Sequence, residues 1–200
     1  MNGDLDLDHD HHHDHDRRSA PAPADHTDHT DHTDHTDHTD QDVYARLIAE
    51  LDAAGAQYRL IEHAPEGRTE VVSALRGHAL AHAAKCLILL VKIGKKQTRY
   101  VLGVVPGDAR LDLAAVKALL GASYVAFADT GKAEELAGSP TGTVLPFSYD
   151  ERLELIADPA LLDRDELYFN AGRLDRSIAL SSKDYQRLAQ PRIARIAAGG

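Results

Sequence analysis

The chain has 200 residues, and its formal net charge of −10 excludes a protein that is basic throughout. Residues 1 to 40 hold twelve Asp and only two Arg, whereas acidic and basic residues balance from 41 to 200. The folded part is therefore neutral, and a local basic patch on it could still bind nucleic acid. The single cysteine, Cys86, excludes an intramolecular disulfide. Because no apolar run approaches the roughly 20 residues that cross a bilayer, we expect a cytoplasmic protein without a membrane anchor.

Residues 1 to 40 form a low-complexity tail. They contain ten of the thirteen histidines and repeat Asp-His-Thr five times, from Asp25 to Thr39. Because almost nothing in this segment is apolar, no core can offset the chain entropy, and we expect it to be disordered. Composition favours a solvated extension without a ligand, and the alternative is weak binding of zinc, nickel or copper. We expect the folded domain to span residues 41 to 200.

Downstream of the tail, apolar spacing and the positions of glycine predict short helices mixed with short strands. In chain order, the patterns predict a helix at 42–55, a strand at 58–63, a helix at 69–77, strands at 85–93 and 99–105, a helix at 111–121, a strand at 124–128, a helix at 130–138, strands at 152–158, 166–171 and 177–181, and a helix at 182–189. Strict alternation of strand and helix is absent. We therefore expect the α+β class, with one curved, mixed sheet of about seven strands, partly open and barrel-like, flanked by short helices.

Lys85 stands at the start of an apolar run, Cys86 to Val91, that is typical of a buried strand. A lysine at a strand end either extends into water or places a fixed positive charge at the mouth of a pocket. In the second case it could hold a phosphate or an ester substrate. Its position in the sequence is equally consistent with both interpretations.

A Gly- and Pro-rich stretch, GSPTGTVLP, spans residues 138 to 146. It is either a surface turn or a loop whose glycines let a ligand approach the backbone N–H groups closely. N–H groups presented in this way can stabilise a developing oxyanion.

Other signals are weaker. His78 and His82 have a spacing that could bind a metal on a helix, but no neighbouring Asp, Glu or Cys completes a set, so we expect no metal site there. Cys86 is expected to be a core residue rather than a nucleophile.

The sequence lacks G-x-S-x-G, Walker A and G-x-G-x-x-G motifs, which disfavours a serine hydrolase, a P-loop nucleotidase and a dinucleotide enzyme. Basic residues cluster at Lys92–Arg99 and at Arg187–Arg195, either as solvated faces or as contacts to RNA phosphates.

Four features occur in a characteristic order. They are Glu62-His63 at the end of a first strand, Lys85 at the start of an apolar strand, the loop from Gly142 to Pro146 followed by Phe147, and FNAGRLDRSIALS from Phe169 to Ser181. Together they resemble the YbaK/EbsC family of aminoacyl-tRNA deacylases, which is related to the editing insertion domain of bacterial prolyl-tRNA synthetases. The resemblance covers residues 42 to about 196, and it departs from many members at Ser148, where they have glycine.

The resemblance implies a freestanding trans-editing hydrolase that cleaves the ester joining a wrong amino acid to the terminal adenosine of a tRNA. It implies no cofactor and no side-chain nucleophile, because water attacks the ester with assistance from the substrate. Lys85 would hold the tRNA 3′ end, and the backbone N–H groups of Gly142, Thr143 and Val144 would stabilise the oxyanion. The pocket or its support is expected to include His63, Gly138, Leu145, Pro146, Asn170 and Ser177.

The implied substrate is a tRNA mischarged with a small amino acid such as Ala, Ser or Cys, and a synthetase could recruit the protein. Two alternatives stay open. The first is a binding module of the same fold that holds tRNA or a nucleotide without hydrolysis. The second is a metal-buffering protein in which the His-rich tail carries the function on a passive domain.

Overall fold

The structure, a computed structural model, describes residues 37–198, with side chains from Val43 onward. Most of the predicted disordered tail, together with its metal-binding alternative, falls on residues 1–36 and lies outside this part. Helix α1 (Asp37–Ala53) begins at Asp37 rather than at residue 42. Its apolar stripe of Val43, Leu47 and Leu51 is buried, as the amphipathic pattern predicts.

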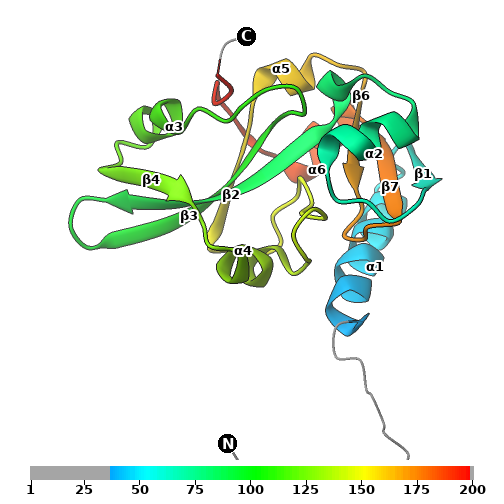
Figure 1. The fold of residues 1–200 in the computed structure, drawn as a ribbon, viewed down its shortest axis with the longest axis horizontal. Helices are drawn as coiled ribbons and strands as arrows, with labels where there is room; N and C mark the ends of the chain where they lie inside the picture. Colours follow the sequence, from blue (N-terminus) through cyan, green and yellow to red (C-terminus); the bar gives the residue numbers. More distant parts are fainter. Residues whose placement is uncertain (1–36, 199–200) are drawn as a thin grey trace, which may run out of the picture. The chain divides into compact units, whose positions relative to one another are not determined.

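The strands form two sheets (Figure 1). The first is antiparallel with the order β1-β7-β6, and its strands are β1 (Tyr58–Glu62), β7 (Arg176–Ser181) and β6 (Glu166–Asn170). The second has the order β4-β2-β3-β5-β8, and its strands are β4 (Tyr124–Phe127), β2 (Ala84–Ile93), β3 (Gln97–Pro106), β5 (Leu153–Ala157) and β8 (Arg192–Ile193). It is mixed, because β5 runs parallel to β3 and to β8 while β2 is antiparallel to its neighbours.

Short helices connect these strands. After α1 they are α2 (Thr69–Arg76), the 3₁₀ turn η1 (Leu80–His82), α3 (Leu113–Leu119), α4 (Thr130–Ala137), α5 (Pro159–Leu162) and α6 (Ser182–Ala189). Among residues 37–198, no helix combines the length and apolar character needed to span a membrane.

The predicted α+β class is confirmed, and so is the hairpin of β2 and β3 around Gly94. The structure differs from the predicted single sheet, because β1, β6 and β7 pair only with one another. An isolated parallel bridge joins Ala83, just before β2, to Tyr168 of β6, and neither sheet closes into a barrel in the described residues. Helix α5 was not predicted from the sequence, because its four residues are too few to show a helical period.

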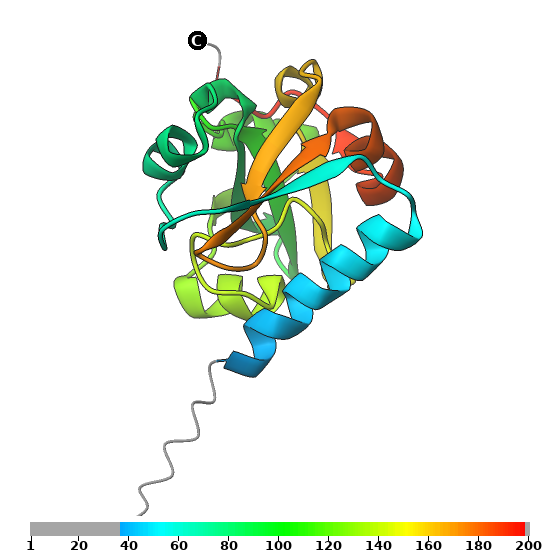
Figure 2. The same ribbon diagram turned by 90° about the vertical axis from the view of Figure 1, so that its right-hand side faces the viewer.

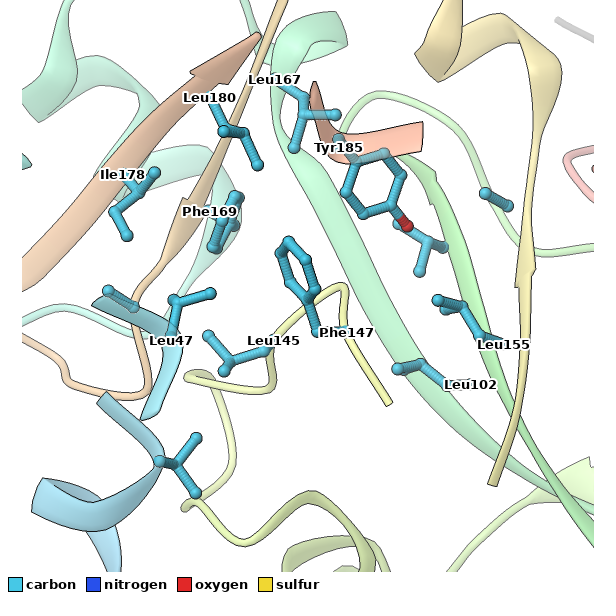
Figure 3. Packing of buried hydrophobic residues seen from close by; sticks show 14 of the residues in the cluster. Leu47, Leu102, Leu145, Phe147, Leu155, Leu167, Phe169, Ile178, Leu180 and Tyr185 are labelled. Carbon is cyan, nitrogen blue, oxygen red and sulfur yellow. The ribbon is translucent and has the colours of Figure 1, made fainter. Parts of the chain in front are cut away.

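The main core fills the space between the two sheets (Figures 2 and 3). Figure 3 shows Ile178 and Leu180 of β7 on one side and Leu102 and Leu155 on the other, with Phe147 between them. The ring of Phe147 lies edge-on to Tyr185, with 5.5 Å between ring centroids. Phe147 belongs to the loop that follows Gly142, so the core fixes one end of that loop.

We expect Asp158→Ala to lower the free energy of unfolding by about 2 to 4 kcal/mol, because a buried carboxylate holds three backbone N–H groups. Asp158 is 3% exposed, and its oxygens accept hydrogen bonds from Ala160 at 2.9 Å and from Ile196 and Ala197 at 2.8 Å each. It thereby caps α5 and joins the C-terminal segment to β5. Urea unfolding measures the effect, and the exposed Asp165→Ala should stay within about 0.5 kcal/mol of wild type. Equal stability of both variants would contradict this role.

Candidate active site

A cavity of about 340 Å³ opens where the two sheets meet. Its walls are the start of β2, the end of β6, one face of α2 and the loop around Gly142. The polar and charged residues that line it are Arg68, Thr69, Glu70, Arg76, Lys85, Thr141, Tyr168 and Asn170. The volume is at the small end of the about 300 to 1,000 Å³ that ligand pockets occupy.

Lys85 lines this cavity and is half-buried. Its Nζ donates a hydrogen bond to the carbonyl oxygen of Ala109 at 3.1 Å. Ala109 lies in the turn that follows β3, so the lysine is held by the protein at the mouth of β2. The structure therefore favours a fixed charge over a side chain that extends freely into water.

The loop around Gly142 presents backbone N–H groups beside the same cavity. Gly142 and Val144 line it, and within residues 37–198 neither N–H group donates to a protein acceptor. The N–H of Thr143 differs, because it donates to the Pro140 carbonyl at 3.0 Å, and the buried Thr143 hydroxyl donates to the same oxygen at 2.7 Å. Two of the three expected oxyanion donors thus have no acceptor in the described part of the chain, and Thr143 closes the turn between them.

Gly142 has a φ of 90°, and its backbone packs against that of Gly67. A Cβ added at Gly142 would lie 2.8 Å from Gly67 Cα and 3.1 Å from Gly67 O, both of them main-chain atoms. Real Cβ atoms essentially never come within 3.0 Å of another heavy atom, and L side chains rarely adopt this φ. Glycine at position 142 is therefore required for two independent reasons.

The side chain of Asn170 holds the loop around Gly142 in place through a hydrogen bond to its main chain. It is 5% exposed, and its Nδ2 donates to Gly142 O at 2.8 Å and to Glu66 O at 2.9 Å. Its Oδ1 accepts from Arg76 Nη2 and lies 3.0 Å from Ser177 Oγ. Hydrogen bonds on both ends of the side-chain amide thus fix its orientation.

His63 and Ser177 extend the same hydrogen-bond chain away from the cavity. Ser177 Oγ lies 2.6 Å from His63 Nε2, and His63 Nδ1 lies 2.8 Å from the carbonyl oxygen of Ala64. Neither His63 nor the fully buried Ser177 lines the cavity. The structure brings these two residues together with Asn170, as supports of the pocket rather than as part of its surface.

We expect Asn170→Ala to lower kcat by about 10- to 100-fold, since displacing a reacting geometry by about 1 Å can cost that much. The substitution removes both bonds that hold Gly142 and Glu66. Ser177→Ala is the matched variant, because Asn170 then keeps its bonds to Arg76 and to the loop, and we expect less than about a tenfold loss. The single-turnover rate of hydrolysis of a mischarged aminoacyl-tRNA is measured for both variants. If Ser177→Ala lowered kcat as much as Asn170→Ala, the larger role assigned to Asn170 would be contradicted.

Arg76 is a cavity residue that the sequence analysis missed. Its guanidinium forms no ion pair in the described part of the chain, and its buried Nε has no hydrogen-bond partner there. Burial lowers the pKa of Arg76 to about 10, so it stays charged at neutral pH. Thr69, Val72 and Arg76 line the cavity at helical positions i, i+3 and i+7, and this spacing could have identified them once α2 was placed beside a pocket.

Besides His63 and Ser177, three further expected pocket residues do not line the cavity. Gly138 is the left-handed residue that ends α4, with a φ of 64°. Leu145 and Pro146 are buried, and Leu145 belongs to the main core. Ser148, the departure from the family pattern, points to β5, with its Oγ 2.7 Å from Leu153 O. These residues anchor the loop.

The remaining candidates behave as structural residues. Cys86 is half-buried in the cavity wall, and burial raises the pKa of its thiol well above the ordinary value, which opposes a thiolate nucleophile. His78 stacks on Tyr168 at 3.9 Å between ring centroids, beyond the Gly77 residue that ends α2, so it shares no helix with His82. No group of three His, Cys, Asp or Glu side chains suitable for a metal occurs in the described residues.

Fold and site together define a class of protein: a small α+β domain with a cavity lined by positively charged side chains and by residues whose backbone N–H groups have no acceptor in the described part of the chain. Residues 63–188 match the family described as the aminoacyl-tRNA editing domain. The chain belongs to this family, which confirms the resemblance found in the sequence.

Named relatives and solved structures agree with this assignment. The chain is 40% identical over 151 residues to the multifunctional Ser/Thr-tRNA deacylase ProXp-y of Escherichia coli K12, covering 75% of this chain and 90% of the relative. It is 24% identical over 153 residues to the prolyl-tRNA editing protein ProX of Acetoanaerobium sticklandii, covering 74% and 92%. The crystal structure of the hypothetical protein APE2540 superposes with a TM-score of 0.69 at 26% identity, covering 76% of this chain and 99% of that one. A candidate trans-editing enzyme for prolyl-tRNA synthetase shares the fold, with a TM-score of 0.65 at 23% identity, covering 78% and 98%.

Proposed function

We propose that this protein is a freestanding aminoacyl-tRNA deacylase that hydrolyses the ester of a tRNA mischarged with a small amino acid. The observation that carries the proposal is the cavity, which Lys85, Gly142 and Val144 line together in a chain of the editing family, with no protein acceptor for the two N–H groups in the described residues. Ser is the first candidate and Ala, Cys and Thr follow, because a relative that is 40% identical is named for Ser and Thr.

In the proposed reaction, a water oxygen attacks the ester carbonyl carbon and forms a tetrahedral intermediate. The N–H groups of Gly142 and Val144 donate to its oxyanion, and Lys85 holds the nucleotide end of the substrate. The carbon–oxygen bond to the ribose then breaks, and the ribose oxygen leaves with a proton. The products are the free amino acid and the uncharged tRNA, and groups of the substrate assist the proton transfers.

The test is hydrolysis of a panel of tRNAs charged with Ser, Ala, Cys or Thr, each compared with its spontaneous rate. We expect rapid hydrolysis of at least one. If the protein binds tRNA tightly and in a salt-dependent manner but hydrolyses none of the panel, the binding-module alternative replaces the proposal.

Equilibrium dialysis with zinc tests the second alternative. Zinc binding that is confined to residues 1 to 40 and too weak to matter in a cell would remove the metal-buffering alternative.

We further propose a cytoplasmic location, where aminoacyl-tRNAs are used. Recruitment by a synthetase stays a prediction that co-purification tests.

A further inference from the structure

A second cavity, of about 640 Å³, lies next to the candidate active site. Three arginines, Arg110, Arg164 and Arg195, line it together with Ala109, and we call it the arginine cleft. They come from the turn after β3, the segment after α5 and the C-terminal segment. Figure 1 shows α5 and the C-terminal segment at one end of the domain, and the bonds from Asp158 to Ile196 and Ala197 join them.

The three guanidinium groups have no carboxylate partner within 4.0 Å among the described residues. Thirteen arginines have described side chains, and seven of them form ion pairs within 4.0 Å. The six without such a pair are Arg46, Arg76, Arg99, Arg110, Arg164 and Arg195. Half of this set therefore lines one cleft, and Arg76 lines the neighbouring cavity.

Three carboxylates also line the cleft, but none of them forms an ion pair with these arginines in the described part of the chain. Asp158 is buried, and both of its oxygens accept backbone hydrogen bonds. Asp108 and Asp163 also line the cleft and are exposed, yet neither forms an ion pair within the described residues. The lining therefore holds three arginines and three aspartates, and within the described residues none of the three guanidinium groups is paired with a carboxylate, so each can bind an external acceptor. Arginine matches the paired oxygens of a phosphate in this way.

The arginine cleft and the candidate active site share a boundary. Ala109 lines the cleft, and its carbonyl oxygen accepts the hydrogen bond from Lys85 Nζ, while Lys85 lines the other cavity. Ala81 lines the cleft, and Ala83 and Ala84, close along the chain, line the active site. A polymer whose end occupies the active site can therefore continue past Lys85 into the cleft.

We propose that the arginine cleft binds the phosphodiester backbone of the RNA strand whose 3′ end carries the ester. This inference rests on the proposed function for the identity of the ligand. Of the basic cluster at Arg187–Arg195, only Arg195 lines the cleft and would contact the RNA. Arg187 and Arg192 instead form ion pairs with Asp184 and Glu154. The proposal also gives the exposed β2–β3 hairpin, with Lys95, Lys96 and Arg99, no part in holding this strand.

The first experiment measures binding of uncharged tRNA to the full chain across a series of salt concentrations. The double variant Arg164→Gln and Arg195→Gln can no longer neutralise two phosphates, and it should bind at least about tenfold more weakly at low salt. The slope of log K against log salt should fall by about 0.7 for each phosphate of a single strand that is no longer neutralised. Arg99→Gln is the matched control, since this exposed arginine also lacks an ion pair, and it should change affinity less than about twofold. An unchanged slope in the double variant, or weaker binding confined to Arg99→Gln, would overturn the proposal.

The second experiment compares hydrolysis of mischarged tRNA with that of the same amino acid esterified to adenosine, which has no phosphate. The double variant should raise KM for the tRNA about tenfold and leave kcat/KM for the adenosine ester unchanged. Equal losses on both substrates would indicate a structural defect and overturn the inference. Because the binding experiment uses uncharged tRNA, a wild type that binds through the cleft but hydrolyses nothing would contradict the proposed function and support the cleft.

Discussion

Replacing Lys85 by alanine should reduce kcat/KM for deacylation about 10²- to 10³-fold, the range for loss of one preorganised electrostatic group in an active site. The side chain is half-buried and its Nζ is held by Ala109 O, so the charge is already in place when substrate arrives. The variant should remain folded, because it loses one hydrogen bond, worth about 1 kcal/mol. Single-turnover hydrolysis and thermal unfolding, measured on the same preparation, separate the two effects.

Lys92→Ala is the matched control for Lys85→Ala. Lys92 lies on the same strand, is exposed and does not line the cavity, so its loss should leave turnover unchanged. Lys85→Met tests the charge alone, since methionine keeps most of the apolar stem. A folded Lys85→Ala variant with normal turnover would remove this residue from the mechanism.

Replacing Gly142 by alanine should lower kcat at least about 100-fold through displacement of the N–H groups of Gly142 and Val144. The added methyl would meet the main chain of Gly67, which has no side chain that could rotate away. The φ of 90° adds strain, and together we expect a loss of about 1 to 3 kcal/mol in the free energy of unfolding. Hydrolysis kinetics and urea unfolding measure the two losses.

Gly131→Ala provides the matched control for Gly142→Ala. Gly131 lies within α4, and an added Cβ there would meet only Asp129 Oδ1 at an ordinary 3.7 Å. Alanine in a helix should stabilise the protein by about 0.5 to 1 kcal/mol and leave turnover unchanged. Equal turnover of Gly142→Ala and wild type would contradict the proposed oxyanion role of the loop.

The sequence predicted most elements because their patterns are local. Helices α2, α4 and α6 end within one residue of the predicted positions, since Gly77 and Gly138 mark two of those ends. The division of the strands into two sheets could not be predicted from the sequence, because it depends on which strands, distant along the chain, pair with each other. Nothing in the sequence of β1 specifies that it pairs with β7, more than 100 residues later.

The candidate site shows the same limit. Lys85, Gly142, Val144 and Asn170 were expected and do line one cavity. The roles of His63 and Ser177 as supports could not be separated from substrate contact, since this requires the register that places Ser177 opposite Asn170. Arg76 was missed because an arginine on an amphipathic helix is ordinary until the helix is placed against a cavity.

The loop that carries Gly142 is fixed at both ends before any substrate binds. Phe147 holds one end in the core, and Asn170 holds the other through Gly142 O. In the proposed oxyanion role, such a preformed loop would need no reorganisation when charge develops, so it would act on any ester that reaches it. A correctly charged tRNA presents the same ester, and a rigid loop cannot reject it by failing to close. In this proposal, discrimination between a correct and an incorrect esterified amino acid therefore depends on the rest of the cavity wall. That wall either accommodates the amino-acid side chain or excludes it.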